Sequence, residues 1–308
     1  MLQKVLEIKN LSKSYKKRTV VNNISFSVFE SEIFGFIGTN GAGKSTTIKM
    51  VTGLAKIDSG EVFICGKSVK KEFTKAIENV GAIIESPEMY NFMTGYENLL
   101  FFARLHKNVT RERIMEVVNI VGLTNRINEK VKNYSMGMKQ RLGIAQAILH
   151  KPKLLILDEP TNGLDAYGIV EVRNMLKKLA KQDRMAILIS SHILAELEQI
   201  CDTIAIIKDG SIVELKSLKE LQKSANEGNK IAIKVDYPNF AGKLIIQKFG
   251  INVEVAGSEV VCFAPEKEAP SLMNYLISKN ISVFNVRAVT KTLEQIFMDI
   301  VSNSKGGK

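Results

Sequence analysis

The chain has 308 residues, of which 45% are hydrophobic and 24% charged, and this composition excludes a disordered, collagenous or disulfide-scaffold protein. At roughly 150 residues per domain, the length allows two domains, or one large domain with an appendage. The 43 Lys and Arg against 32 Asp and Glu leave a net charge of +11. That charge suits a protein that works beside nucleotide phosphates, nucleic acid or an anionic membrane, and does not choose among them.

Neither disulfides nor a membrane segment is indicated. Cys65, Cys201 and Cys262 are far apart and form no paired motif, which favours a reduced, cytosolic protein. The N-terminus carries charges every few residues and lacks the apolar centre of a signal peptide. Because no run reaches the roughly 18 apolar residues of a membrane span, we expect any membrane role to be exercised from outside the bilayer.

The first sixty residues predict a β layer followed by a strand, a loop and a helix. Strand-like runs at 5–8 and 24–29 flank a Ser-Lys-Ser-Tyr turn at 12–15, and we expect them to form an antiparallel layer. The apolar run 33–37 leads into a glycine-rich turn, and a helix is expected from Ser45 onward. A loop of this size between strand and helix is suited to holding a phosphate.

The middle of the chain predicts an α/β core with a helical insert. Residues 96–149 are helix-like, with Ile114, Val117, Val118 and Val121 at helical spacing. The apolar runs 154–157 and 186–189 are typical of parallel strands that are buried on both faces. We place the helical subdomain at about residues 86–149.

The C-terminal quarter predicts a second, smaller module. Apolar content falls at 223–230, which we interpret as a linker after a first domain of residues 1–222. Alternating patterns at 231–236, 251–257, 259–265 and 281–289 predict half-buried strands, with a helix at 270–279. We therefore expect a small α+β module at 231–301 and a disordered tail at 302–308.

The glycine-rich turn carries a phosphate-binding pattern. Residues 38–45 fit G-x-x-x-x-G-K-[ST], in which glycines let backbone N–H groups turn toward phosphate oxygens at a helix N-terminus. In this pattern Lys44 reaches the β- and γ-phosphates, and the hydroxyl of Ser45 binds Mg²⁺. The sequence thus predicts a nucleoside triphosphate site.

Two carboxylates follow the apolar run 154–157. Asp158 and Glu159 lie at the tip of the predicted strand. There the first acid can anchor Mg²⁺ and the second can polarise the attacking water, so phosphoryl transfer gives them separate roles. Such a strand end is common, and it becomes informative in combination with the phosphate loop.

Residues 134–141, with the sequence YSMGMKQR, complete a set of motifs that resembles the ATP-binding subunits of ATP-binding-cassette (ABC) transporters over about residues 1–222. The resemblance implies an α/β fold of P-loop NTPase type, with a RecA-like core, an antiparallel β layer and a helical subdomain. It further implies that Ser135 and Gly137 contact the ATP that the other subunit holds. The N-cap preference of serine and the dipole of the following helix agree with an anion at that place.

The resemblance also assigns the remaining ATP contacts. Asp165 falls in the family's D-loop, His192 in the position of the switch histidine that contacts the γ-phosphate, and Tyr15 in that of the aromatic that stacks on adenine. We expect catalytic roles for Glu159, His192 and Lys44. The phosphate loop is expected to contact ATP through Gly38, Thr39, Asn40, Gly41, Ala42, Gly43, Lys44, Ser45 and Thr46.

One position departs from the family pattern. Glu85 stands where the family ordinarily has a glutamine that ligates Mg²⁺ and senses the γ-phosphate. A carboxylate can ligate the metal but adds a negative charge near the phosphates. We therefore expect Ser45, Asp158 and Glu85 to be the metal ligands.

Short phrases around Glu85, Thr94, Ser135 and Thr292 resemble one branch of the family, the bacitracin-type exporters and lantibiotic-immunity transporters of Gram-positive bacteria. The resemblance implies an ATPase that pairs with a second copy or a close paralogue. It also implies a separate transmembrane permease and a location at the cytoplasmic face of the cell membrane.

A soluble ABC-type ATPase that acts on ribosomes or nucleic acid is the alternative. Such proteins usually carry two cassettes or a long coiled coil, neither of which the chain has. Residues 1–222 hold 32 basic and 24 acidic residues, and 223–308 hold 11 and 8, so no basic arm is concentrated anywhere. We expect no nucleic-acid partner.

Overall fold

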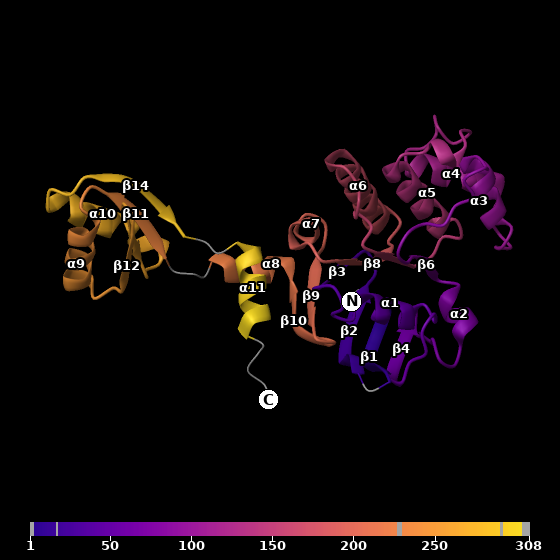
Figure 1. The fold of residues 1–308 in the computed structure, drawn as a ribbon, viewed down its shortest axis with the longest axis horizontal. Coiled ribbons are helices and arrows are strands. Elements are labelled where there is room, and N and C mark those ends of the chain that lie inside the picture. The colour runs from indigo at the N-terminus through magenta and orange to yellow at the C-terminus, as the bar shows by residue number, and fades with distance from the viewer. Residues whose placement is uncertain (1–2, 17, 227–229, 290–291, 304–308) are drawn as a thin grey trace. The chain divides into compact units, whose positions relative to one another are not determined.

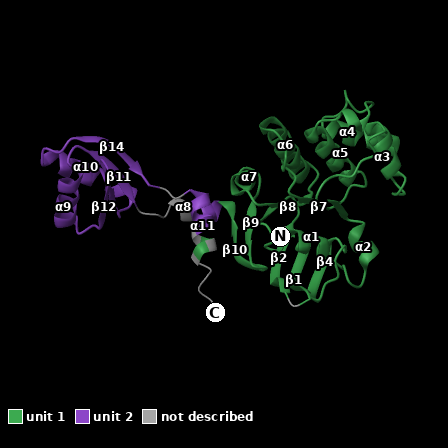
Figure 2. Ribbon diagram, viewed as in Figure 1, with its two compact units in different colours: residues 1–218, 300–308 green, residues 219–299 purple. Residues whose placement is uncertain are grey.

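The computed structural model describes residues 3–16, 18–226, 230–289 and 292–303, which belong to two compact units (Figures 1 and 2). The first unit comprises residues 1–218 and 300–308, and the second comprises residues 219–299. Each unit has a hydrophobic core of its own.

An antiparallel sheet of four strands opens the first unit, in the order β2-β1-β4-β5. Its strands are β1 (Lys4–Tyr15), β2 (Arg18–Phe29), β4 (Ser59–Ile64) and β5 (Lys67–Ser68). The antiparallel layer is as predicted, but the turn predicted at 12–15 is wrong. Strand β1 continues through these residues because shifts of register after Ile8 and Leu11 bend it while it stays paired with β2.

The second sheet of this unit has six strands in the order β10-β9-β3-β8-β7-β6, of which β10 alone is antiparallel to its neighbour. The strands are β3 (Ile33–Ile37), β6 (Val80–Ile83), β7 (Leu154–Asp158), β8 (Ala186–Ser191), β9 (Thr203–Lys208) and β10 (Ser211–Ser217). Every residue of β3, β7 and β8 is buried, which confirms the prediction made for β7 and β8 from their apolar runs.

The two sheets share one core. It joins apolar side chains of β1, β2 and β4 to those of β3, β7 and β8, and it takes in the inner face of α1 (Lys44–Val51). Phe26 of the antiparallel layer stacks on Phe34 of β3, with ring centroids 4.9 Å apart. The phosphate loop between β3 and α1 is thus anchored at both ends in packed structure.

Of the other helices of the first unit, α2 contacts β4 and β5 of the four-stranded sheet, whereas α5, α6 and α7 contact strands of the six-stranded sheet. Three of them, α3, α4 and α5, contact one another and gather in a lobe of their own (Figure 1). Thr94 starts this lobe with a reciprocal capping box to Glu97. The helices are α2 (Phe73–Ile77), α3 (Gly95–Ala103), α4 (Arg111–Ile120), η1 (Val131–Asn133), α5 (Met136–Ile148), α6 (Ala166–Gln182) and α7 (Leu194–Glu198).

The second unit holds a four-stranded antiparallel sheet in the order β12-β13-β11-β14. Its elements follow one another as strand, helix, strand, strand, helix, strand: β11 (Ile231–Val235), α9 (Pro238–Phe249), β12 (Val253–Ala256), β13 (Glu259–Cys262), η2 (Glu266–Glu268), α10 (Ala269–Ser278) and β14 (Val283–Ala288). Helix α9 was not predicted from the sequence. Pro238 in its first turn and Gly250 at its end, with a left-handed φ of 65°, are the signals that could have found it.

Two predicted irregular segments are partly helical. Helix α8 (Leu218–Asn226) includes residues 223–226 of the predicted linker, while 227–229 lie outside the described residues. Helix α11 (Leu293–Asn303) includes the first two residues of the predicted tail, and 304–308 lie outside the described residues. A capping box between Thr292 and Gln295 begins α11, and apolar residues recur at helical spacing as far as Val301.

All three cysteines are free, and Cys201 and Cys262 are buried. Burial raises the pKa of the Cys262 thiol to about 11, so this side chain is a neutral core residue. Among the described residues, none of the helices combines the length and apolarity that crossing a bilayer requires.

Candidate functional site

The loop between β3 and α1 is shaped by glycine. A Cβ at Gly38 would lie 2.4 Å from the carbonyl oxygen of Ile207, and one at Gly43 would lie 2.7 Å from that of Val20. Helix α1 begins directly after this loop without a side-chain cap and without an acidic residue in its first turn. Its N-terminal N–H groups therefore remain for an anion, and a phosphate fits this cradle.

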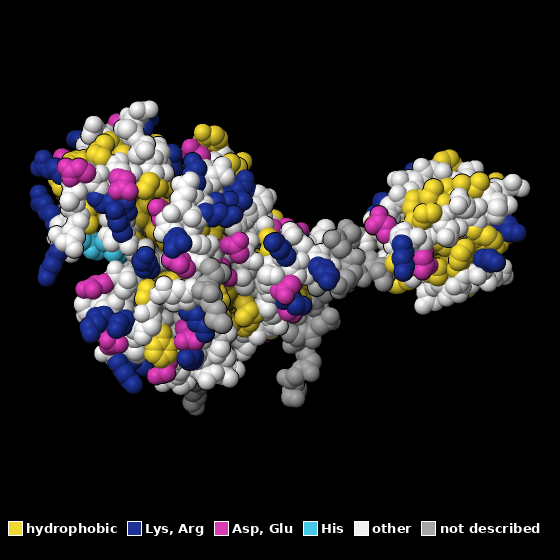
Figure 3. All heavy atoms as spheres, turned by 180° about the vertical axis from the view of Figure 1, so that it is seen from behind, with side chains coloured by type: hydrophobic (Ala, Val, Ile, Leu, Met, Phe, Trp, Pro, Cys, Tyr) yellow, Lys and Arg dark blue, Asp and Glu magenta, His cyan; other side chains and the backbone are white. Residues whose placement is uncertain are grey.

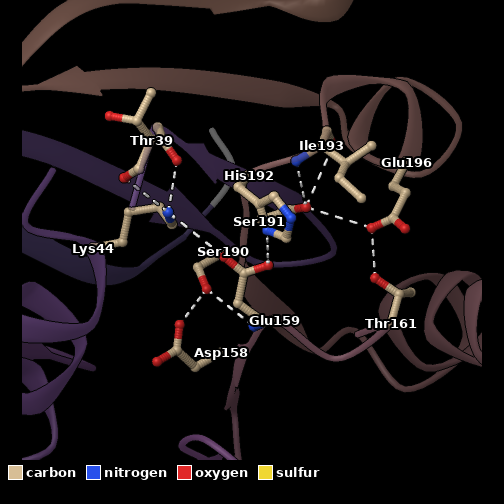
Figure 4. Close-up of polar contacts among 11 residues, drawn as sticks. Thr39, Lys44, Asp158, Glu159, Thr161, Ser190, Ser191, His192, Ile193 and Glu196 are labelled. Atoms are coloured by element: carbon tan, nitrogen blue, oxygen red, sulfur yellow. Dashed lines mark hydrogen bonds and ion pairs between the residues drawn. The ribbon is translucent and has the colours of Figure 1, made fainter. Parts of the chain in front are cut away.

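Lys44 points its ammonium group across the mouth of the loop. Its Nζ donates to the carbonyl oxygen of Gly38 at 2.6 Å and to that of Thr39 at 3.4 Å. The same Nζ lies 3.5 Å from Oε1 of Glu159, at the end of β7 (Figure 4). A buried cation thus connects the phosphate loop to the acidic strand end.

Asp158 is the last residue of β7 and lies opposite Ser190 in the parallel register with β8. The hydroxyl of Ser190 donates to the carboxylate of Asp158 and accepts the N–H of Glu159 at 3.1 Å. Ser190 is fully buried. This one side chain therefore fixes both acidic residues, and no sequence motif predicted its role.

Glu159 adopts a left-handed backbone conformation, with φ of 51°. This conformation costs an L-residue about 1–2 kcal/mol, so the surroundings must hold it. Its N–H donates to the Ser190 carbonyl at 3.2 Å, and its own carbonyl accepts from the N–H of Asn162 at 3.1 Å. The turned backbone brings Oε2 to 2.8 Å from Nδ1 of His192.

Three predicted catalytic residues from distant parts of the chain therefore meet (Figure 4). The carboxylate of Glu159 lies between the ammonium of Lys44 and the imidazole of His192. A carboxylate in this place can accept a proton from water, while the imidazole can hydrogen-bond a polar group on its other nitrogen. The predicted metal ligands Ser45 and Asp158 lie at the two edges of the same site, at the start of α1 and the end of β7.

The contacts of Tyr15 and Glu85 are with lysine side chains outside this cluster. Tyr15 is 49% exposed, and Nζ of Lys13 lies 5.1 Å from the centroid of its ring. Glu85 follows β6 with φ of 69°, and its exposed carboxylate lies 3.0 Å from Nζ of Lys49 on α1. The carboxylate raises the pKa of Lys49, so the negative charge that departs from the family pattern has a cationic neighbour.

Ser135 and Asp165 are both helix caps. The Ser135 hydroxyl accepts from the N–H of Met138 at 3.3 Å, and the Asp165 carboxylate accepts from that of Gly168 at 2.8 Å. Gly137 on α5 lies beside Leu164, since a Cβ there would be 4.0 Å from the leucine side chain. The approach of Gly137 to Leu164 thus brings the start of α5 close to the start of α6.

The chain is similar to known proteins over nearly its whole length. Residues 21–162 match the family model described as ABC transporter. The chain is 45% identical over 304 residues to an uncharacterized ABC transporter ATP-binding protein of Bacillus subtilis, YhcH, covering 99% of this chain and 98% of the relative.

Other relatives carry transport names. A bacitracin transport ATP-binding protein of Enterococcus faecalis is 44% identical to this chain over 223 residues, which are 72% of this chain and 72% of the relative. A lantibiotic transport ATP-binding protein of Streptococcus pyogenes is 43% identical over 68% of this chain and 89% of its own. A solved dimer of the ATP-binding cassette MJ0796, described as a post-hydrolysis state bound to ADP and Pi, is 25% identical with a TM-score of 0.62, over 69% of this chain and 98% of that one.

Proposed function

The chain belongs to the ATP-binding subunits of ABC transporters, and from this membership we propose that it hydrolyses ATP to drive a membrane exporter of peptide antibiotics of the bacitracin or lantibiotic kind. The observation that supports the ATPase most strongly is the meeting of Lys44, Glu159 and His192 at the mouth of the phosphate loop. The names of the relatives support the class of cargo.

In the proposed site, the N–H groups from Gly38 to Thr46 and the ammonium of Lys44 hold the phosphates of ATP. Ser45, Asp158 and Glu85 would hold Mg²⁺, which neutralises charge on the β- and γ-phosphates when bound. Glu159 accepts a proton from the attacking water, and His192 donates a hydrogen bond to the γ-phosphate. Tyr15 would stack on the adenine.

The proposed enzyme works as a dimer, because Ser135, Gly137 and Asp165 would complete the ATP site of the partner. ATP turnover per molecule should therefore rise cooperatively with protein concentration. Steady-state ATPase measured over a dilution series tests this expectation. A specific activity that stays constant through the range in which the protein changes from monomer to dimer would contradict it.

Mixing two inactive variants gives a sharper test of shared sites. Lys44→Ala should prevent a chain's own phosphate loop from binding ATP. Ser135→Arg should instead prevent a chain from contacting the ATP that its partner holds. A mixed dimer then keeps one intact composite site, so activity should exceed the sum of the separate variants. Simple additivity in the mixture would argue against sites shared between chains.

Glu85 should act through its oxygen as a metal ligand. Glu85→Gln keeps a carbonyl oxygen, so Mg²⁺-dependent ATPase should fall less than in Glu85→Ala. Drug resistance should fall in both variants, because the charge beside Lys49 would set the geometry that couples the site to the permease. ATPase at graded Mg²⁺ concentrations and resistance in cells measure the two effects.

Glu88→Gln is the matched control for this experiment, since Glu88 is exposed three residues further along the same segment. It should leave both measurements unchanged. Wild-type values in Glu85→Gln and Glu85→Ala alike would mean that Glu85 is a surface residue and no ligand.

The proposed partner in the membrane is a separate permease, which holds the chain at the cytoplasmic face of a Gram-positive cell. On the face seen in Figure 3, Lys and Arg side chains of residues 1–218 lie among Asp and Glu side chains. This face therefore lacks the continuous basic patch that binding to a nucleic-acid backbone requires. Affinity purification in detergent should recover a membrane protein with this chain. Recovery of RNA without any membrane protein would favour the ribosome or nucleic-acid alternative.

A further inference from the structure

A third carboxylate, that of Glu196, lies behind the site and joins two of its segments. Its Oε2 accepts the hydroxyl hydrogen of Thr161 at 2.5 Å and lies 3.4 Å from the hydroxyl of Ser191 (Figure 4). Thr161 comes two residues after Glu159, and Ser191 comes directly before His192. One side chain of α7 thus contacts the segment that carries the proposed proton acceptor and the segment that carries the proposed switch histidine.

Glu196 lies in the first turn of α7, where an acidic side chain ordinarily stabilises the start of its own helix. It is the third residue of α7, where an acidic side chain interacts favourably with the helix dipole and often caps the N-cap N–H. That N–H, of Ile193, instead donates to the hydroxyl of Ser191 at 3.0 Å. The carboxylate of Glu196 is therefore directed at Thr161, away from its own helix.

Packing does not fix this contact by itself. A cavity of about 150 Å³ lies beside Thr161, Ser191 and Glu196, lined by apolar side chains of α6 and α7 such as Val172 and Leu197. A side chain that borders a void loses the contacts that would otherwise hold it in place. The strand pairing of Asp158 with Ser190 holds the two segments at one end, and the hydrogen bond from Thr161 to Glu196 adds a second tie beyond the strands.

We infer that Glu196 is a positioning residue. It accepts a hydrogen bond from Thr161 and thereby keeps the side chains of Glu159 and His192 within hydrogen-bond distance of each other during ATP hydrolysis. The inference rests on the proposed function, because it assigns Glu196 an effect through those two residues. It predicts that loss of the Thr161 hydroxyl slows turnover without weakening ATP binding.

Thr161→Val removes the hydroxyl and keeps the shape of the side chain. A lost hydrogen bond to a charged group corresponds to about tenfold in rate, so kcat should fall by about that factor. Thr161→Ser keeps the hydroxyl and should restore kcat, while KM and nucleotide affinity should stay near the wild-type values in both variants. Gln199→Ala, an exposed residue directly after α7, is the control for effects on the helix itself.

A double-mutant cycle separates positioning from general destabilisation. Glu196→Ala should lower kcat as Thr161→Val does, and the double variant should be no slower than the slower single one, because both changes remove one contact. Glu196→Gln keeps an acceptor oxygen and should lose less activity than Glu196→Ala. The thermal midpoint of each full-length variant shows whether a loss of kcat merely follows a loss of folded protein.

The outcomes distinguish this inference from the proposed function. If the wild type lacks ATPase activity, the proposed function is wrong and the inference falls with it. If the wild type is active and Thr161→Val is equally fast, or Thr161→Ser is as slow as Thr161→Val, only the role of Glu196 is overturned. Additive losses in the double variant would overturn it as well.

Discussion

Replacing Glu159 by glutamine should nearly abolish steady-state ATP turnover while ATP still binds. The amide has the size of the carboxylate, and its oxygen can still accept a hydrogen bond from Lys44 or from Nδ1 of His192. It cannot take a proton from water, and general-base catalysis contributes about 10²–10⁴-fold to rate. We therefore expect turnover to fall by at least about a hundredfold, and the variant to accumulate as an ATP-bound dimer.

Phosphate release and binding of a fluorescent ATP analogue measure the two halves of this prediction, and size-exclusion chromatography with ATP measures the dimer. Glu61→Gln on β4 is the matched control, because it makes the same change at an exposed place outside the site. Turnover within threefold of the wild type would remove Glu159 from the role of base.

Lys44→Ala should fail one step earlier, in ATP binding itself. The ammonium lies at hydrogen-bond distance from the carbonyl of Gly38, at the N-terminus of α1. Loss of charged hydrogen bonds worth about 1.5–3 kcal/mol corresponds to roughly 10–100-fold in affinity. Equilibrium titration with a fluorescent ATP analogue measures this loss directly.

Lys56→Ala supplies the comparison for Lys44→Ala, since Lys56 is an exposed lysine shortly after α1. It should bind ATP as the wild type does. Normal nucleotide affinity in Lys44→Ala, together with a normal thermal midpoint, would refute the assignment of this loop as the phosphate site.

The fold could be predicted where local pattern and packing agree. Strands β7 and β8 consist of apolar residues that are buried on both faces, and the sequence shows this as unbroken apolar runs. Helix α9 was missed because its apolar residues are interrupted by Gly242, which fits there since it packs against Val253 of β12. The extension of β1 through 12–15 depends on bulges that form only when β2 lies beside it.

The residues of the site likewise differ in whether a local sequence pattern predicts them. Lys44 and Glu159 follow from local motifs, because a glycine loop before a helix and an acid at a strand end carry their chemistry in consecutive residues. The pairing of Asp158 with Ser190 follows from the register of two parallel strands, and no consecutive residues encode that register. The contact of Thr161 with Glu196 likewise joins segments that are 35 positions apart.

Drug resistance in the native host tests most directly whether ATP hydrolysis at this site powers export. The minimal inhibitory concentrations of bacitracin and of a lantibiotic are compared among strains that carry the wild-type gene, the Glu159→Gln variant or a deletion. We predict that the Glu159→Gln strain is as sensitive as the deletion strain to at least one of the two drugs, with the variant protein present at wild-type levels. Wild-type resistance to both drugs in that strain, with its ATPase activity lost, would contradict the account.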